Sequence, residues 1–287
     1  MIKEKICLVT GANSGIGFET AKELCAQGAR CIFVCRSEEK AKKAIGEIER
    51  LIPDAKTDFA VADLSSQKQV RDLSQTVLAR YDTLDVLIHN AGSWFSDFAL
   101  TEDGLERQWA INYLSPFLLT HLLLPALKNS RDARVINISS DSHFHGKIHF
   151  QDVNLSGNYH GLRAYAQSKL AQVLFTFEFE RRKAGLPVSI NAVQPGLVKT
   201  DIGLKHTVSF HGLMWKLRRL TAVSPEKGAA TAVYLASSEE VKNLSGKYWD
   251  KCKPKPASKN ANNQDDARRL WELSEQMCGI KNFFEVD

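Results

Sequence analysis

The sequence predicts an α/β fold in which a doubly wound parallel sheet is covered by helices on both faces. Short apolar segments of strand length alternate with segments of helical periodicity through the first two-thirds of the chain. Strands that are apolar throughout and separated by helices are typical of a parallel sheet buried on both faces. The 287 residues, 44% hydrophobic and 25% charged, suit one large globular domain and exclude a disordered or fibrous chain.

The alternation can be followed element by element. The first expected strand, Ile6–Thr10, leads through a glycine-rich turn into a helix from Ile16 to Gln27. A second helix is expected from Glu38 to Leu51, where Pro53 follows. Five further short apolar segments are expected to be strands, and each is followed by a helical stretch. They are Cys31–Cys35, Phe59–Ala62, Val86–Ile88, Val135–Ile138 and Ser189–Val193.

The last third of the chain has a looser pattern. From about Thr200, apolar and basic residues follow one another with helical character and without a strand. Residues 224–226, Ser-Pro-Glu, then open a helix that runs to Ser238, because serine caps a helix and proline suits its first turn. The polar segment 251–263 is expected to be a surface loop, and 265–277 a last amphipathic helix.

No internal repeat or linker divides the chain, so we expect a single domain over residues 1–287 with a C-terminal extension, residues 251–287. The net charge of +5 demands no nucleic acid and suits an anionic cofactor or substrate. The six cysteines lack C-x-x-C spacing, which favours a reducing compartment. The chain begins directly with a strand, and prolines and polar residues interrupt its longest apolar stretch, 114–127. We therefore expect a cytoplasmic protein without a membrane-spanning segment.

The turn after the first strand is the first candidate for a ligand site. Residues 10–17 read Thr-Gly-Ala-Asn-Ser-Gly-Ile-Gly. Glycines let the backbone approach a pyrophosphate closely, and the start of a helix offers unpaired N–H groups. Three glycines could also form an ordinary tight turn, and their spacing differs from G-x-G-x-x-G, but the position between strand and helix favours a dinucleotide. The expected contacts are Gly11, Asn13, Ser14, Gly15, Ile16 and Gly17.

This turn and four further motifs, in order along about 190 residues, resemble the short-chain dehydrogenase/reductase family. The other four are Asp63-Leu64, Asn90-Ala91-Gly92, Tyr165-x-x-x-Lys169 and Pro195-Gly196. The resemblance implies a Rossmann-type fold, a nicotinamide dinucleotide and hydride transfer. More narrowly, residues 137–150, NISSDSHFHGKIHF, together with Ser168 and the segment VLFTFEFERR, resemble the retinol dehydrogenase-like branch.

The end of the second strand bears on the choice of cofactor. NAD-dependent enzymes place an acidic residue about 20 residues beyond the glycine turn, where it holds the ribose 2′-hydroxyl. Here Cys35 and Arg36 stand instead, and a guanidinium can hold a 2′-phosphate by paired, charge-assisted hydrogen bonds. We therefore expect NADP(H). The alternative is that Arg36 is an ordinary solvated arginine, since the glycine turn contains no second basic residue.

Tyr165 and Lys169 are the expected proton-transfer pair. Four residues apart in a helix, they lie on one face. Reduction of a carbonyl requires a proton and the reverse reaction a base; tyrosine can serve if a neighbouring ammonium and the cofactor's charge lower its pKa of about 10. By resemblance, Lys169 also holds the nicotinamide ribose. Ser140, at the end of a strand, is expected to orient the substrate oxygen, with Ser139 as the competing candidate and a plain turn serine as the alternative.

The resemblance implies roles for further residues. Asn112 matches a fourth catalytic position, where its amide would hold a water that links Lys169 to solvent; a polar residue on an exposed helix face is the alternative. Asp63 and Leu64 would flank the adenine, although Asp63 alone could be a helix cap. The remaining expected cofactor contacts are Asn90, Ala91, Gly92, Pro195, Gly196, Val198 and Thr200.

By the same resemblance, residues 200–223 form a cap over the substrate. The apolar and basic residues of 203–219 favour a hydrophobic carbonyl or alcohol of retinoid, lipid or steroid type, and peripheral contact with an anionic membrane; covering the core is the alternative. His143, His145 and His149 have no cysteine or carboxylate to complete a metal site, so we expect no metal and place them on the surface or at the substrate rim.

We therefore expect an NADP(H)-dependent oxidoreductase that acts on an apolar carbonyl or alcohol. The alternatives are an NAD-dependent alcohol dehydrogenase of the same fold and a non-catalytic dinucleotide-binding regulator. A nucleotide-sugar epimerase or dehydratase shares Tyr-x-x-x-Lys but differs in glycine spacing and has a larger substrate domain. Family members commonly pair through the helices that hold Asn112 and Tyr165, and a homodimer would form there.

Overall fold

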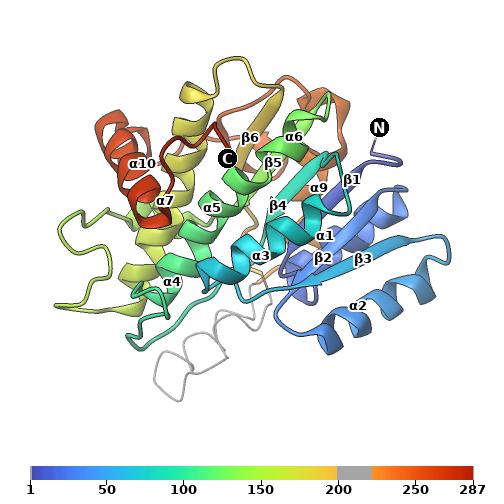
Figure 1. The fold of residues 1–287 in the computed structure, drawn as a ribbon, viewed down its shortest axis with the longest axis horizontal. Coiled ribbons are helices and arrows are strands. Elements are labelled where there is room, and N and C mark those ends of the chain that lie inside the picture. The colour runs from blue at the N-terminus through green and yellow to red at the C-terminus, as the bar shows by residue number, and fades with distance from the viewer. Residues whose placement is uncertain (1, 199–221, 287) are drawn as a thin grey trace.

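The computed structural model describes residues 2–198 and 222–286, which form an eight-stranded sheet of order β3-β2-β1-β4-β5-β6-β7-β8 (Figure 1). Strands β3 to β7 pair in parallel, and β8 is added antiparallel at one edge. The predicted Rossmann-type α/β class is therefore confirmed. The strand order changes direction between β1 and β4, and open α/β sheets bind ligands beyond the carboxyl ends of their strands at such a point.

The strands are short, and β4 and β5, in the middle of the sheet, are buried at every residue. In chain order they are β1 (Ile6–Thr10), β2 (Arg30–Cys35), β3 (Lys56–Val61), β4 (Val86–His89), β5 (Ala133–Ile138), β6 (Val188–Gln194), β7 (Lys247–Asp250) and β8 (Lys253–Pro254). All six predicted strands are present, with ends that differ by three residues or fewer.

The α-helices of more than three residues are α1 (Gly15–Ala26), α2 (Glu38–Leu51), α3 (Gln67–Leu78), α5 (Ser115–Leu122), α6 (Leu124–Lys128), α7 (Gly161–Arg182), α9 (Pro225–Ser237) and α10 (Gln264–Cys278). Of these, α1, α2, α9 and α10 begin and end within one residue of their predicted positions. Shorter helical turns are α4 (Arg107–Trp109), the π-helix η1 (Ala110–Leu114), and the 3₁₀ turns η2 (Asp141–His145), η4 (Glu239–Val241) and η5 (Asn260–Asn262). Ser224 occupies the N-cap position of α9, where the sequence predicted it.

The strand β7 was missed by the sequence analysis. Its four residues, Lys-Tyr-Trp-Asp, carry a charge at each end, so no apolar segment marks it. Tyr248 and Trp249 are nonetheless buried, one on each face of the sheet, because β7 pairs with β6. The polar segment after it is largely exposed as predicted, but Lys253 and Pro254 at its beginning pair with β7.

Helices cover both faces of the sheet, and α10 adds an outer layer on one of them (Figure 1). Helices α1, α2 and α9 lie on one face, whereas α3, α5 and α7 lie on the other. Helix α10 packs on α7, and Trp271 and Phe283 bury their rings against Phe117 and Phe175. The C-terminal extension therefore covers apolar surface of α5 and α7, the helices expected at a dimer interface.

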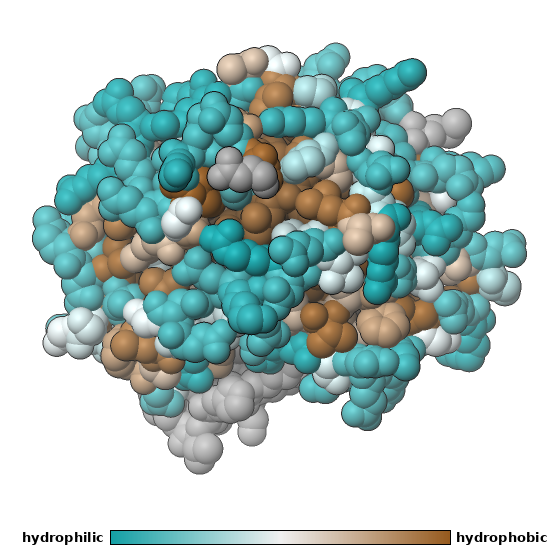
Figure 2. Space-filling model, in the orientation of Figure 1, coloured by the Kyte–Doolittle hydropathy of each residue, from teal (hydrophilic) through white to brown (hydrophobic). Residues whose placement is uncertain are grey.

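No helix among the described residues is long and apolar enough to cross a membrane. Figure 2 shows hydrophobic side chains gathered around α5 and α6, with hydrophilic side chains over most of the rest of that face. Pro116 and Pro125 stand in the first turns of α5 and α6 and divide the apolar stretch into two short helices.

Candidate active site

The glycine turn between β1 and α1 has the shape that a dinucleotide requires. Gly11 and Gly15 have φ angles of +66° and +58°, a conformation that other residues rarely adopt. A Cβ atom on Gly17 would overlap the Gly11 carbonyl and the Asn90 side chain. Ser14, at the start of α1, is exposed, and its side chain makes no capping bond. The turn therefore leaves the N–H groups of α1 open to an anion, which fits a pyrophosphate.

The turn after β4 is tied to the glycine turn by hydrogen bonds. Thr10 Oγ1 accepts from the backbone N–H groups of Asn90 and Ala91, both at 3.0 Å. The Asn90 side chain donates to the Thr10 carbonyl at 2.8 Å. These bonds hold the two expected cofactor loops side by side, where the strand order changes direction.

Cys35 and Arg36, at the end of β2, differ sharply in environment. Cys35 is buried beside the backbone N–H groups of Ala12 and Asn13, and burial raises the pKa of its thiol to about 11. It therefore supports the turn as a neutral side chain. Arg36 is exposed and forms no ion pair with any acidic side chain within residues 2–198 and 222–286.

The remaining expected cofactor residues take different positions. Asp63 closes its own turn by accepting from the Ser65 N–H at 2.9 Å, and Ser66, not Asp63, caps α3. Leu64 packs in the core. The segment after β6 contains Pro195, Gly196 with a φ angle of +82°, and Val198, which forms a parallel bridge with Val223. Thr200, the basic segment 203–219 and nearly all of the expected cap, residues 200–223, lie outside the described residues.

Lys169 is held in the interior by neutral partners. Its side chain is 3% exposed, and its Nζ donates to the Ile138 carbonyl at 2.7 Å and to Gln172 Oε1 at 3.1 Å. Burial lowers the pKa of this amine to about 7. The Nζ lies 5.6 Å from the centre of the Tyr165 ring, so the two predicted residues share one face of α7.

Tyr165 is a poor acid in the protein alone. Burial raises the pKa of its hydroxyl to about 12, against a smaller lowering by a hydrogen bond with Ser140. The lowering expected from the Lys169 ammonium and the cofactor's charge would have to overcome this effect of burial. At neutral pH the side chain is protonated and able to donate.

The structure separates the two candidate serines. Ser139 is buried, and its hydroxyl donates to the Lys169 carbonyl at 2.9 Å, which places it in the support of α7. Ser140 is partly exposed, bonds to Tyr165, and accepts from the Ser142 N–H at 3.1 Å. Ser140 is thus the serine that faces the proton-transfer pair.

Asn112 is fully buried in the π-helix η1, which excludes the exposed-face alternative. Its Nδ2 donates to the Ser93 carbonyl at 2.9 Å and to Ser168 Oγ at 3.0 Å, and its Oδ1 accepts from the Ser93 N–H at 2.8 Å. The amide therefore joins the loop after β4 to α7. π-helical turns occur often at functional sites.

The expectation for His143 was wrong. This residue is fully buried, and its ring packs at a tilt against the Tyr248 ring, with ring centres 4.6 Å apart. Its Nε2 accepts from the Ser258 N–H at 3.1 Å, so its Nδ1 carries the proton and donates to the Ser140 carbonyl at 2.8 Å. It joins the C-terminal extension to Ser140, a contact that residues 115 positions apart do not reveal in sequence. His145 is exposed and His149 partly so.

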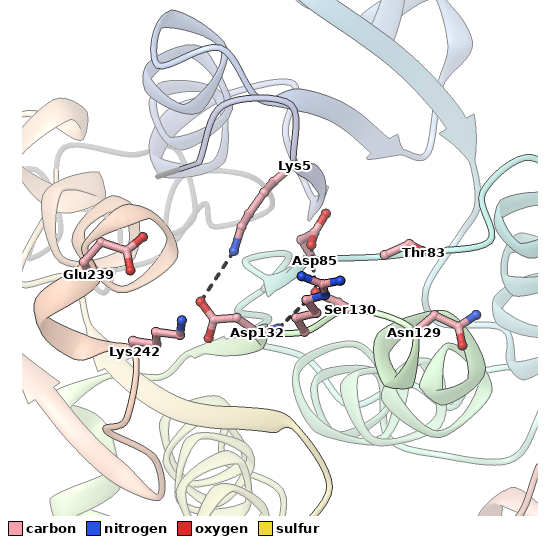
Figure 3. A pocket seen from close by; sticks show the side chains of 9 residues that line it. Lys5, Thr83, Asp85, Asn129, Ser130, Asp132, Glu239 and Lys242 are labelled. Carbon is pink, nitrogen blue, oxygen red and sulfur yellow. Dashed lines mark hydrogen bonds and ion pairs between the residues drawn. The ribbon is translucent and has the colours of Figure 1, made fainter.

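The described residues contain no group of three or more histidine, cysteine or acidic side chains that could hold a metal ion. A cavity of about 420 Å³ lies before the amino ends of β1, β4 and β5 (Figure 3). There Lys5 reaches Asp132 at 3.4 Å, and Asp85 binds Ser130 and the N–H of Ile6. Its aspartates thus join strand ends, opposite the edge that carries Ser140.

A glycine turn for a dinucleotide, beside a buried Tyr-Lys pair and a serine, defines a nicotinamide-dependent oxidoreductase. A family model described as "short chain dehydrogenase" matches residues 5–207. The chain belongs to the short-chain dehydrogenase/reductase family, in its retinol dehydrogenase-like branch, and the resemblance of the motifs is confirmed. Such an enzyme binds a nicotinamide dinucleotide and acts on a small molecule.

Named relatives cover almost the whole chain. Mouse retinol dehydrogenase 14 is 39% identical over 96% of this chain and 86% of its own length. Human retinol dehydrogenase 13 is 40% identical over 98% of this chain and 86% of its own length. A crystal structure of an uncharacterised protein from Mycobacterium paratuberculosis superposes with a TM-score of 0.80 and 31% identity, over 99% of this chain and 96% of that one.

Proposed function

We propose that the protein is an NADP(H)-dependent oxidoreductase that interconverts an apolar aldehyde or ketone, of retinoid or lipid type, and its alcohol. The observation that carries the proposal is the grouping of Tyr165, Ser140 and Lys169 at the carboxyl ends of the strands, beside the glycine turn. Two relatives named retinol dehydrogenase support the choice of substrate class. So do the exposed apolar side chains on the loops at this edge, Phe98, Phe144, Leu197 and Val223.

Each residue of the group has a role in proton transfer. The nicotinamide, when bound, supplies or accepts the hydride. In the reductive direction, the Tyr165 hydroxyl gives its proton to the substrate oxygen, while Ser140 donates a hydrogen bond to the same oxygen. The Lys169 ammonium stabilises the tyrosinate that remains. In the oxidative direction, the tyrosinate takes the proton from the alcohol.

Arg36 is the proposed contact with the 2′-phosphate of NADP(H), because it is exposed at the end of β2 and forms no ion pair with the described acidic residues. Fluorescence titration of the purified protein with NADPH and NADH tests this role. We expect Arg36→Ala to weaken NADPH by about 10- to 100-fold and to leave NADH unchanged. Arg50→Ala, at the other end of α2, is the matched control. Equal binding of both cofactors by the wild type would overturn the choice of NADP(H).

Turnover is tested with a panel of retinoid and aliphatic aldehydes, followed by NADPH oxidation. Replacement of Tyr165 by Phe removes the proton that the mechanism needs but keeps the ring, so we expect NADPH binding to persist and kcat to fall by about 1,000-fold or more. Near-normal turnover by this variant would overturn the mechanism. Tight NADPH binding without turnover of any member of the panel would favour a non-catalytic regulator.

A further inference from the structure

The ammonium of Lys169 has three N–H groups, and the described residues accept two of them. One donates to the Ile138 carbonyl and one to Gln172 Oε1. A Cβ atom on Gly92 would lie 3.5 Å from the Nζ, so the small residue of the turn after β4 adjoins the amine. The third N–H is therefore available on the side of the turn after β4, which is one of the expected cofactor contacts.

Gln172 lies one helical turn beyond Lys169 and is fully buried. Its amide orientation is fixed by chemistry, because an oxygen must face the ammonium. The Nε2 on its other side has no hydrogen-bond partner among the described residues. A buried amide with a donor left unpaired is less favourable in a core than an apolar side chain of the same size. The side-chain hydrogen bond of Gln172 is directed to Lys169.

Hydrogen bonds from neighbouring buried residues hold Gln172 in position. The Thr176 hydroxyl donates to the Gln172 carbonyl at 2.8 Å and accepts from Asn137 Nδ2 at 3.0 Å. Asn137 is fully buried on β5, next to the strand residue whose carbonyl receives Lys169. The two acceptors of the ammonium therefore come from one rigid unit of α7 and β5.

We propose that Gln172 is a positioning residue for the catalytic lysine: it and the Ile138 carbonyl hold the ammonium so that its remaining N–H faces the cofactor. The inference rests on the proposed function for its catalytic consequence. Its structural part, the hydrogen bond from Lys169, is testable in the protein alone.

Few ionisable groups face Lys169. Tyr165 is the titratable side chain next to it, and burial accounts for its lowered pKa without any charged neighbour. Ionisable groups on the elements around α7 are engaged elsewhere. They are Glu106 and Arg107 of the α4 turn, His89 of β4, Asp141 and His143 of η2, Tyr248 and Asp250 of β7, and Glu275 of α10.

The test is an NMR titration of the lysine side chains in the cofactor-free protein, with Lys169 assigned by its absence from a Lys169→Met spectrum. We expect Gln172→Met to lower the pKa of Lys169 by about one pH unit, because a buried ammonium loses an acceptor. Gln172→Glu should raise it by about one unit or more. The opposite signs distinguish an effect on the charge from a general loss of packing.

Gln167→Met is the matched control. Gln167 is also a buried glutamine of α7, but it binds the His149 N–H and the Val153 carbonyl instead of the lysine. Its loss should leave the pKa of Lys169 unchanged. A pKa of Lys169 that stays the same in both Gln172 variants, or moves equally in the Gln167 variant, would overturn the proposal.

The same variants are then compared in turnover, with kcat and KM measured against pH. We expect the fall of kcat at high pH to begin about one unit lower in Gln172→Met and higher in Gln172→Glu, with little change in aldehyde KM. If the pKa of Lys169 shifts as expected in the Gln172 variants but the wild type turns over no substrate, the hydrogen bond is confirmed and the proposed function is rejected. Shifted pKa values with an unshifted kcat profile would reject the positioning role.

Discussion

The hydrophobic cores on the two faces of the sheet contain different types of side chain. Beneath α1, α2 and α9 the core is built mainly of alanine, isoleucine, valine and cysteine, with Phe33 and Trp249 as its fully buried aromatic side chains among the described residues. Beneath α5, α7 and α10 it contains a continuous aromatic cluster. Its fully buried members include Trp109, Tyr113, Phe117, Phe175, Phe179 and Phe283.

The difference matches the part of the site that each face supports: the glycine turn on one face and α7 on the other. The small-residue face lets α1 lie close to α9, and Gly228 contacts Val198 and Ile16, so the backbone of the glycine turn stays near the cofactor edge. The aromatic face anchors α7, the helix that carries Tyr165 and Lys169. The face with small residues lets backbone segments approach one another closely, whereas the aromatic face supports the side chains of α7 rigidly.

The largest expected effect comes from breaking the aromatic face. Phe283 is fully buried between α5, α7 and α10, although it lies near the end of the chain. We expect Phe283→Ala to lower the free energy of unfolding by about 3–5 kcal/mol, since it leaves a cavity among rings. Chemical denaturation of the two proteins measures this loss. Phe284→Ala, at a partly exposed neighbour, should cost clearly less; equal losses would show that the extension contributes no specific packing.

A second prediction tests close approach on the other side. In Gly17→Ala the new methyl group would meet backbone of Gly11 and the Asn90 side chain, so the two cofactor loops must separate. We expect NADPH affinity to fall about 100-fold, or about 2.7 kcal/mol. Gly46→Ala, in α2 with no atom within 4 Å of the new carbon, should bind normally and gain about 0.5–1 kcal/mol of stability. Normal NADPH binding by the Gly17 variant would contradict the tight turn.

Local signals explain what the sequence could predict. The strands of the parallel sheet are apolar runs, and the glycine turn and the Tyr165–Lys169 spacing are contained within a few residues, so both faces could be outlined in advance. The short strand β7 could not be predicted, because its burial depends on pairing with β6. The partners of His143 and Gln172 were also missed. Ser258 is distant in sequence, whereas Gln172 could have been noticed as a polar residue in the apolar run LAQVLF.

The smallest predicted effect concerns Lys169, the buried lysine that α7 carries. The pKa of Lys169 in the folded protein is about 7, below its ordinary value of 10.5. Between pH 6 and pH 8 the folded protein therefore releases this proton while the unfolded chain retains it. Because the unfolded state binds more protons over this range, the lysine's contribution to stability becomes more favourable as pH rises.

We therefore expect the unfolding free energy of the wild type, minus that of Lys169→Met, to rise by about 1.4 kcal/mol from pH 6 to pH 8. Urea denaturation of both proteins at pH 6, 7 and 8 measures the difference, and other titrating groups cancel in the subtraction. Lys183→Met is a suitable control, because this lysine near the end of α7 is paired with Glu180 at 2.8 Å and is not deeply buried. If the stability difference between wild type and Lys169→Met does not change with pH, the lysine is fully charged throughout. The hydrogen bonds that Lys169 donates to the Ile138 carbonyl and to Gln172 Oε1 would then offset its burial completely.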